Sequence, residues 1–255
     1  MHAPEVPNLI TLLTISSLKD KGWVHILHTF ENQFFSLLIV TVVGLAIVFF
    51  VKKLELLPHG IQNLIELIVE KAREFIGGIL GKERGDKYLP FIGSLFLFIF
   101  LNNLLGLIPF FKAPTSSFKT TIALGGLIFF YVQYLALKEN GVLKYFHHLA
   151  GAPDNYITWG LSPLLLILHI IGELSKPLSL ALRLYGNILG EDIVLGTFIG
   201  FGIAVFTYIG IKFPFGLPLH LPFYFLSILT SFLQAFVFSL LTTVYILLVL
   251  PHEEH

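Results

Sequence analysis

Long apolar stretches alternate with short polar segments along this chain of 255 residues. Five of the stretches are long enough to cross about 30 Å of hydrocarbon, which takes roughly 17 to 25 residues of α-helix. They predict membrane helices over residues 34–51, 89–111, 120–137, 161–211 and 222–250. The pattern therefore predicts an all-α polytopic membrane protein, organised as a single membrane domain over residues 1–255.

A different pattern fills residues 58–80, between the first two predicted spans. Apolar side chains such as Leu64 and Ile68 recur every three or four positions, and polar side chains such as Glu66 and Glu70 occupy the other side. This periodicity predicts an amphipathic helix on the membrane surface. A soluble helix with the same pattern would need a soluble domain to pack on, and no segment offers one.

The fourth stretch is too long to stand upright in a bilayer. One helix over residues 161–211 would extend about 75 Å at 1.5 Å per residue. We expect it to be steeply tilted, bent or broken, and Pro177 predicts a kink within it.

Composition supports the membrane assignment and excludes other classes. Only 13% of the residues are charged, about half of the roughly 25% found in soluble domains. The formal net charge is zero, so nothing indicates a nucleic-acid partner, and we expect none. The absence of cysteine excludes disulfides and thiolate metal sites. Lysine and arginine are concentrated between residues 52 and 87 and at residues 138 and 144. The positive-inside rule therefore predicts an outer N-terminus and an inner C-terminus.

Charged and amide side chains interrupt the fourth stretch, although each is expensive in hydrocarbon. An arginine at this depth costs about 2.5–3.5 kcal/mol, so Arg183 indicates a functional charge. On an ideal helix, five further polar residues fall within about 80° of it: His169, Glu173, Lys176, Asn187 and Glu191. Asp192 falls on the opposite side.

A second polar stripe lies on one side of the last predicted span. It contains Ser227, Thr230, Ser231, Gln234 and Tyr245. Two facing stripes predict a path that water can enter. Carboxylates along such a path can relay protons, whereas an arginine does not release its proton. We therefore expect Arg183 to interrupt the proton path between Glu173 and the acids at 191 and 192, and to attract a carboxylate from a partner.

Four segments of the chain resemble subunit a of the F-type ATP synthase membrane sector. They are SKPLSLALRLYGNILGEDIVLG (175–196), FLNNLLGLIP (100–109), PTSSFKTTIALG (114–125) and SFLQAFVFSLLTTVYI (231–246). The resemblance implies a non-catalytic stator subunit with two proton half-channels. It also implies a c-subunit ring, a b-subunit peripheral stalk, other ATP synthase subunits and membrane lipid as partners, without a cofactor or metal. A bacterial inner membrane is favoured over a plastid membrane.

The resemblance also assigns roles to individual residues. Arg183 matches the essential arginine that faces the ring carboxylate, and Asn187 and Gln234 match the polar residues near it. Asn103 matches an asparagine of the second span, and both a channel role and a helix–helix contact stay open for it. The family acid nine residues after the arginine falls on Asp192.

Two features leave the acids of the path open. Helical geometry favours Glu191 as the outer acid, but the resemblance favours Asp192, which we prefer at this point. Ser227 stands where some relatives have histidine, so water or one of these acids would carry the proton there. At the inner side, His169 and Glu173 are both candidates.

A proton-coupled secondary transporter is the alternative function. Such a protein would show inverted repeats or paired broken helices, and the charged stretch occurs once in this chain. An intramembrane protease would need a nucleophile with its base, paired acids or a zinc motif, and the sequence contains none of these motifs.

Overall fold

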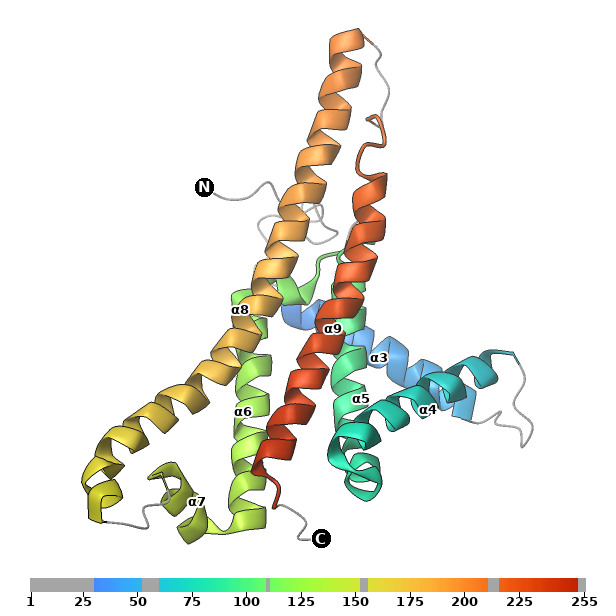
Figure 1. The fold of residues 1–255 in the computed structure, drawn as a ribbon. Helices are drawn as coiled ribbons and strands as arrows, with labels where there is room; N and C mark the ends of the chain where they lie inside the picture. The colour runs from blue at the N-terminus through green and yellow to red at the C-terminus, as the bar shows by residue number, and fades with distance from the viewer. Residues whose placement is uncertain (1–29, 52–59, 109–110, 152–155, 211–215, 252–255) are drawn as a thin grey trace.

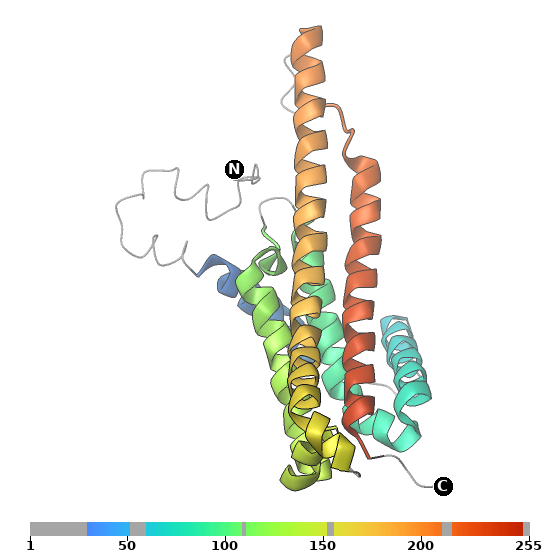
Figure 2. The ribbon, with the colours of Figure 1, turned by 60° about the vertical axis from the view of Figure 1, so that its left-hand side comes forward.

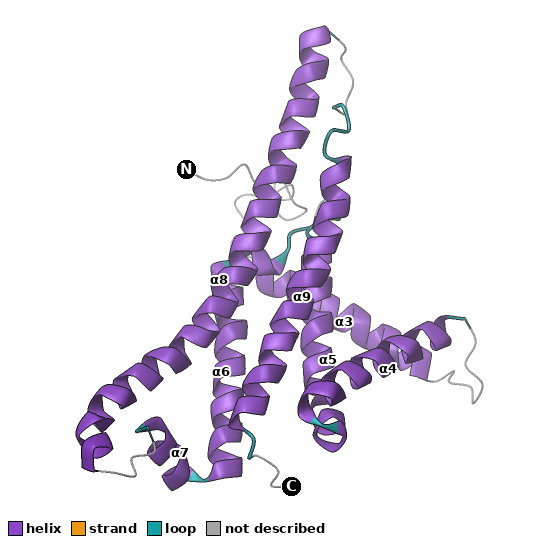
Figure 3. Ribbon diagram, in the orientation of Figure 1, coloured by secondary structure: helices purple, strands orange, loops and turns teal. Residues whose placement is uncertain are grey.

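The computed structural model describes residues 30–51, 60–108, 111–151, 156–210 and 216–251 (Figure 1). Within these ranges the regular structure is helical and contains no strand (Figure 3). The helices are α3 (Glu31–Val51), α4 (Ile61–Leu80), α5 (Lys82–Leu105), the 3-10 turn η1 (Pro114–Ser116), α6 (Phe118–Asn140), α7 (Val142–Leu149), α8 (Tyr156–Ile209) and α9 (Leu221–Val249). Five of them, α3, α5, α6, α8 and α9, are long and apolar enough to cross a membrane. The predicted fold class is confirmed.

The main hydrophobic core lies where α5, α6, α8 and α9 meet (Figures 1 and 2). Ile99, Ile128, Leu184 and Phe238 contribute one side chain from each of these helices, and all four are fully buried. Helix α3 packs separately: its Phe35 meets the C-terminal end of α5 in a smaller cluster. The four-helix core therefore fixes how α8 and α9 face each other.

Helix α4 is joined to α5 by a tight turn. Gly81 has a φ of +86°, which favours glycine. A Cβ on Gly85 would lie 2.7 Å from the Cα of Gly77, so the two helices approach closely there. Only the C-terminal part of α4 reaches the core, through Ile76 and Leu80. Its earlier apolar side chains are exposed in the single chain, and the predicted position on the membrane surface remains a prediction.

The second span differs from its predicted bounds. Helix α5 begins at Lys82 and ends at Leu105, whereas the apolar stretch predicted 89–111. The charged residues in the first turns of α5 are compatible with a helix, but they lower the mean hydropathy there, so the apolar stretch begins later than the helix does. At its end the chain folds back: Gly106 packs against Ala113, and the Thr115 hydroxyl donates to the Asn103 side chain. Phe111 accordingly lies outside the helix.

Helix α8 is one continuous helix of 54 residues that contains Pro163 and Pro177. At 1.5 Å per residue it is about 80 Å long. Figure 1 shows its N-terminal half running diagonally and its C-terminal half running beside α9. Gly125 of α6 packs against the backbone of α8, where an added Cβ would lie 2.6 Å from the Pro177 carbonyl oxygen. The expected long, bent fourth helix is thus present without a break.

The helices alternate in direction along the chain. The α4–α5 turn, α7 and the C-terminal end of α9 lie at one end of the molecule, and η1 and the C-terminal end of α8 lie toward the other (Figure 1). This arrangement agrees with five crossings. The positive-inside prediction would place the α7 end inside the cell.

Candidate ion path along α8 and α9

Arg183 lies near the middle of α8, and its side chain is exposed in the single chain. Among the described residues, no carboxylate pairs with its guanidinium. The Tyr245 phenol of α9 lies within electrostatic range of it. Residues with small side chains surround it on the same face: Ser179, Gly186 and Gly190 are all exposed. Such residues allow another helix to approach closely.

One turn beyond Arg183, α8 and α9 are joined by a side-chain hydrogen bond. Asn187 Nδ2 donates to Gln234 Oε1 over 2.7 Å. Gln234 is buried, and its Nε2 has no hydrogen-bond partner among the described residues. The buried hydroxyl of Ser231, one turn away on α9, also lacks a partner there. Buried polar atoms of this kind are suited to bind water.

Beyond this pair, Glu191 turns toward α9. The Thr230 hydroxyl lies 3.2 Å from its carboxylate and shares its hydrogen between that group and the Ser227 backbone carbonyl oxygen at 3.0 Å. The Ser227 hydroxyl lies close enough to interact with the same carboxylate. Glu191 is half-buried, whereas the adjacent Asp192 is exposed. The structure therefore brings Glu191 to the polar stripe of α9 and leaves Asp192 outside that contact.

On the other side of Arg183, Glu173 is held by two donors. Lys176 Nζ, one turn along α8, forms a short ion pair with it. Gln133 Nε2 of α6 donates to its second oxygen over 3.2 Å. Lys176 also lies over the Tyr245 ring, 5.4 Å from the centroid. Lys176 is thus a structural partner of Glu173, as its helical spacing suggests.

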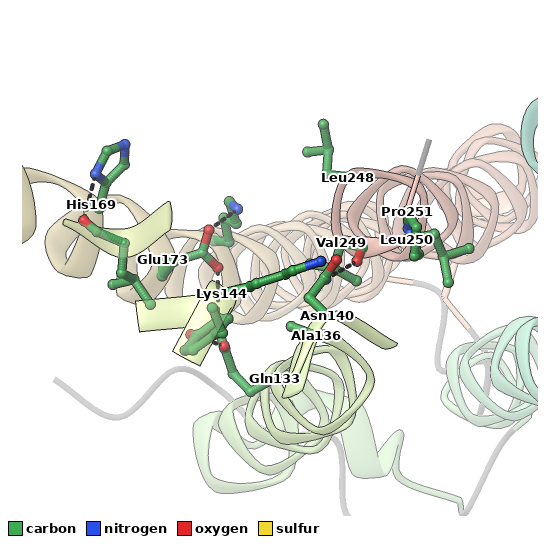
Figure 4. A pocket seen from close by; sticks show the side chains of 13 residues that line it. Gln133, Ala136, Asn140, Lys144, His169, Glu173, Leu248, Val249, Leu250 and Pro251 are labelled. Carbon is green, nitrogen blue, oxygen red and sulfur yellow. Dashed lines mark hydrogen bonds and ion pairs between the residues drawn. The ribbon is translucent and has the colours of Figure 1, made fainter. Parts of the chain in front are cut away.

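Glu173 lines a pocket of about 550 Å³ at the end of the molecule that contains α7 (Figure 4). The walls come from α6, α7, α8 and α9, and Figure 4 shows Lys144 extending across the space between them. His169 is at its edge, where its Nδ1 lies 2.9 Å from the Leu149 carbonyl oxygen. The two inner candidates of the sequence, His169 and Glu173, therefore border one cavity.

Asn103 lies elsewhere. It is buried at the end of α5, where its Oδ1 accepts a 2.7 Å hydrogen bond from Thr115. The neighbouring Asn102 accepts a hydrogen bond from Ser36 of α3. Both side chains contact other segments of the chain, and Asn103 is not among the side chains that join α8 to α9.

Sequence reasoning missed Gln133 and Tyr145. Gln133 is one polar residue in an apolar helix, and Tyr145 lies in residues 138–154, which the sequence predicts only as a partly interfacial connection. The sequence offered little indication of either residue, because a single polar side chain on one helix does not reveal which neighbouring helix that side chain faces. Among the described residues, no group of three or more histidine or acidic side chains could hold a metal.

The chain is similar in sequence to known proteins over most of its length. A family model described as ATP synthase A chain matches residues 33–247. A protein of Protochlamydia amoebophila named ATP synthase subunit a is 44% identical over 98% of this chain and 91% of its own length. Its namesake in Aliarcobacter butzleri is 38% identical over 80% of this chain and 82% of its own length. A Sulfurihydrogenibium protein that is also named ATP synthase subunit a is 34% identical over 88% of this chain and 99% of its own length.

Proposed function

Because the chain belongs to the ATP synthase A chain family, we propose that it provides two offset half-channels for protons, to and from a rotating ring of c subunits. As a family member it is a multi-pass membrane subunit of an ATP synthase complex and is not catalytic by itself. We assign it to a bacterial inner membrane, since the relatives named above are bacterial. The b-subunit peripheral stalk is a further proposed partner.

The observation that carries this proposal is the separation of two acidic sites by one arginine. Glu173 precedes Arg183 by ten residues and Glu191 follows it by eight. At 1.5 Å per residue they lie about 15 Å and 12 Å from it along the helix axis. Each acid has hydrogen-bond donors of its own. Two separate proton paths, with a fixed cation between them, fit this arrangement.

Arg183 is suited to receive a carboxylate from another chain. Its exposed guanidinium has no acidic partner among the described residues, and an unpaired cation facing lipid is unfavourable. The small side chains beside it would admit a ring helix. We propose that Arg183 holds the ionised ring carboxylate and prevents protons from crossing directly between the two paths, since it stays charged.

The outer path would run along the upper part of α8 and α9. A proton would pass from Glu191 to the stripe between Ser227 and Gln234, where the unpartnered atoms of Ser231 and Gln234 can bind water. It would then neutralise a ring carboxylate, which can turn into the lipid. We now prefer Glu191 to Asp192 as the outer acid because Glu191 contacts Thr230.

The inner path would begin on the other side of Arg183. After nearly a full turn of the ring, the proton would leave past Glu173 and His169 into the pocket at the α7 end. Water in a pocket of this size could carry it to the inner surface.

Replacement of Arg183 tests the central assignment. Arg183→Ala should abolish ATP-driven proton pumping and gradient-driven ATP synthesis in membrane vesicles, because the ring carboxylate loses its counter-charge. Lys119→Ala, which removes an exposed cation near the start of α6, is the matched control and should keep both activities. Coupled synthesis that persists in Arg183→Ala would refute the proposal.

The partner can be tested separately. The chain has no cysteine, so a Gly186→Cys substitution on the exposed face beside Arg183 is a unique cross-linking site. It should form disulfides with single cysteines placed near the carboxylate of a c subunit. Leu143→Cys on α7 is the control and should give no such product.

A further inference from the structure

We propose that Gln133 of α6 and Tyr145 of α7 are positioning residues for Glu173, so that α7 forms part of the inner mouth of the proton path. The role in proton release rests on the function proposed above. The contacts themselves are features of the fold, and they join three helices in one chain of hydrogen bonds.

The chain of donors has a defined direction. The Tyr145 hydroxyl donates to Gln133 Oε1 in a short hydrogen bond. The amide nitrogen of Gln133 then faces Glu173 and donates to Oε2 over 3.2 Å. The opposite amide orientation would place the Gln133 oxygen against the carboxylate, where it has nothing to accept. Tyr145 therefore fixes the orientation that lets Gln133 serve Glu173.

Tyr145 is suited to act as a permanent donor. Burial, and after it the charge of Glu173, raise the pKa of the Tyr145 phenol above its ordinary value. A phenol that ionises near pH 10 in water therefore stays protonated throughout the physiological range. The Tyr145 hydroxyl can donate to Gln133 whatever the protonation state of Glu173.

Other charged and titratable groups face Glu173 from each helix packed around it. Lys176 and His169 share α8 with it, Lys144 lies on α7 across the pocket, and Tyr245 approaches from α9. From α6, Gln133 is the polar contact. Lys176 binds one carboxylate oxygen and Gln133 the other, so Gln133 opposes the pull of Lys176 and keeps one oxygen on the pocket side.

The pocket supplies the route from Glu173 to the inner surface. Gln133, Tyr145 and Glu173 all line its wall, and Figure 4 shows Gln133 and Glu173 close together on one side of it. Helix α7 contributes Lys144, Tyr145 and Leu149 to the wall, and its Leu143, which does not line the pocket, is 88% exposed. A displacement of Glu173 toward Lys176 would move the carboxylate away from this space and slow proton release.

The test is a double-mutant cycle in the whole ATP synthase. Passive proton conductance of the membrane sector would be measured in inverted vesicles after removal of the catalytic heads, and normalised to assembled complexes. Gln133→Leu should lower it about tenfold, the loss expected for a hydrogen bond to a charged group. Tyr145→Phe, which removes a hydrogen bond between neutral groups, should lower it several-fold. The double variant should lose no more than the worse single variant, because Tyr145 acts through Gln133.

A pH profile separates positioning from general damage. Both single variants should change the dependence of conductance on inner-face pH, because the Glu173 carboxylate has lost its positioning contact, whereas general damage would lower conductance equally at every pH. Tyr134→Phe is the matched control: Tyr134 is the neighbour of Gln133 and is 58% exposed. It should change neither conductance nor profile.

The outcomes are distinct from those of the proposed function. Wild-type conductance in Gln133→Leu or Tyr145→Phe, an unshifted profile, or losses that multiply in the double variant would each overturn the inference. Arg183→Ala, prepared in parallel, reports on the proposed function. If Arg183→Ala abolishes coupled synthesis while the Gln133 and Tyr145 variants behave normally, only the positioning role fails.

Discussion

At the residue scale, two adjacent carboxylates illustrate how surroundings decide chemistry. Glu191 and Asp192 differ by one position, which is about 100° around a helix. That rotation turns Glu191 toward Thr230 of α9 and leaves Asp192 exposed. Glu191 therefore lies between two helices, with hydroxyl groups and buried polar atoms nearby. This position suits a carboxylate that passes protons to a water-filled path better than the exposed position of Asp192 does.

The first residue-scale prediction compares these acids. Glu191→Gln should reduce passive proton conductance more than tenfold, because an amide cannot take up and release the proton. Asp192→Asn should reduce it by less than about threefold, a difference of roughly 0.7 kcal/mol in barrier. Both variants would be measured in vesicles stripped of the catalytic heads. A greater loss in Asp192→Asn would reverse the assignment.

A second residue-scale prediction concerns the donor that holds the outer acid. Thr230→Val keeps the shape of the side chain and removes the hydroxyl that donates to Glu191. We expect conductance to fall several-fold, since a typical net hydrogen bond contributes about 1 kcal/mol, which is roughly a fivefold change in rate. Thr207→Val on α8 is the control, because its hydroxyl bonds only the backbone of its own helix. Equal effects of the two substitutions would contradict a role for Thr230.

At the element scale, the polar faces of α8 and α9 are aligned by close helix packing. Two adjacent glycines of α6 show how local this requirement is. An added Cβ on Gly125 would lie 2.6 Å from the carbonyl oxygen of Pro177, whereas one on Gly126 would have no neighbour within 4 Å. Gly125 thus allows α6 to contact α8 beside the Glu173–Lys176 pair.

We therefore predict different effects of the same substitution at these two positions. Gly125→Ala should destabilise the folded subunit by about 1–3 kcal/mol, the usual range for overpacking. Gly126→Ala should be neutral or slightly stabilising, because alanine favours helix over glycine. Thermal unfolding of the detergent-solubilised complex would compare the two. An unchanged melting temperature for Gly125→Ala would contradict the prediction, because it would mean that α6 and α8 can move apart to admit the methyl group without a loss of stability.

At the scale of the whole molecule, the direction of the helices decides which path opens on which side. The α7 pocket lies at one end and the Glu191 site lies beyond Arg183 in the other direction (Figure 1). The lysine and arginine distribution predicts that the α7 end is inside the cell. The direction of proton flow through each path depends on this orientation.

Single cysteines test the orientation, because the chain has none of its own. Leu143→Cys on α7 should react with a membrane-impermeant thiol reagent only from the inner face. Lys119→Cys, at the start of α6 and exposed, should react only from the outer face. Labelling of intact cells and of inverted vesicles distinguishes the two faces. The opposite pattern would exchange the entrance and the exit.

The sequence alone determined the helices of this protein and the face of α8 that carries its charges. Hydropathy and helical period depend on neighbouring residues, so five apolar helices and the sector around Arg183 followed from local pattern. End positions were less certain: α5 ends at Leu105 because Gly106 and Ala113 pack together, a contact that hydropathy does not encode.

Only the tertiary structure decided which side chains meet across helices. It paired Asn103 with Thr115, turned Glu191 to Thr230, and brought Gln133 to Glu173. These contacts depend on how far each helix is shifted and rotated against its neighbours. Packing of the whole core sets those shifts and rotations, and no single stretch of sequence contains them.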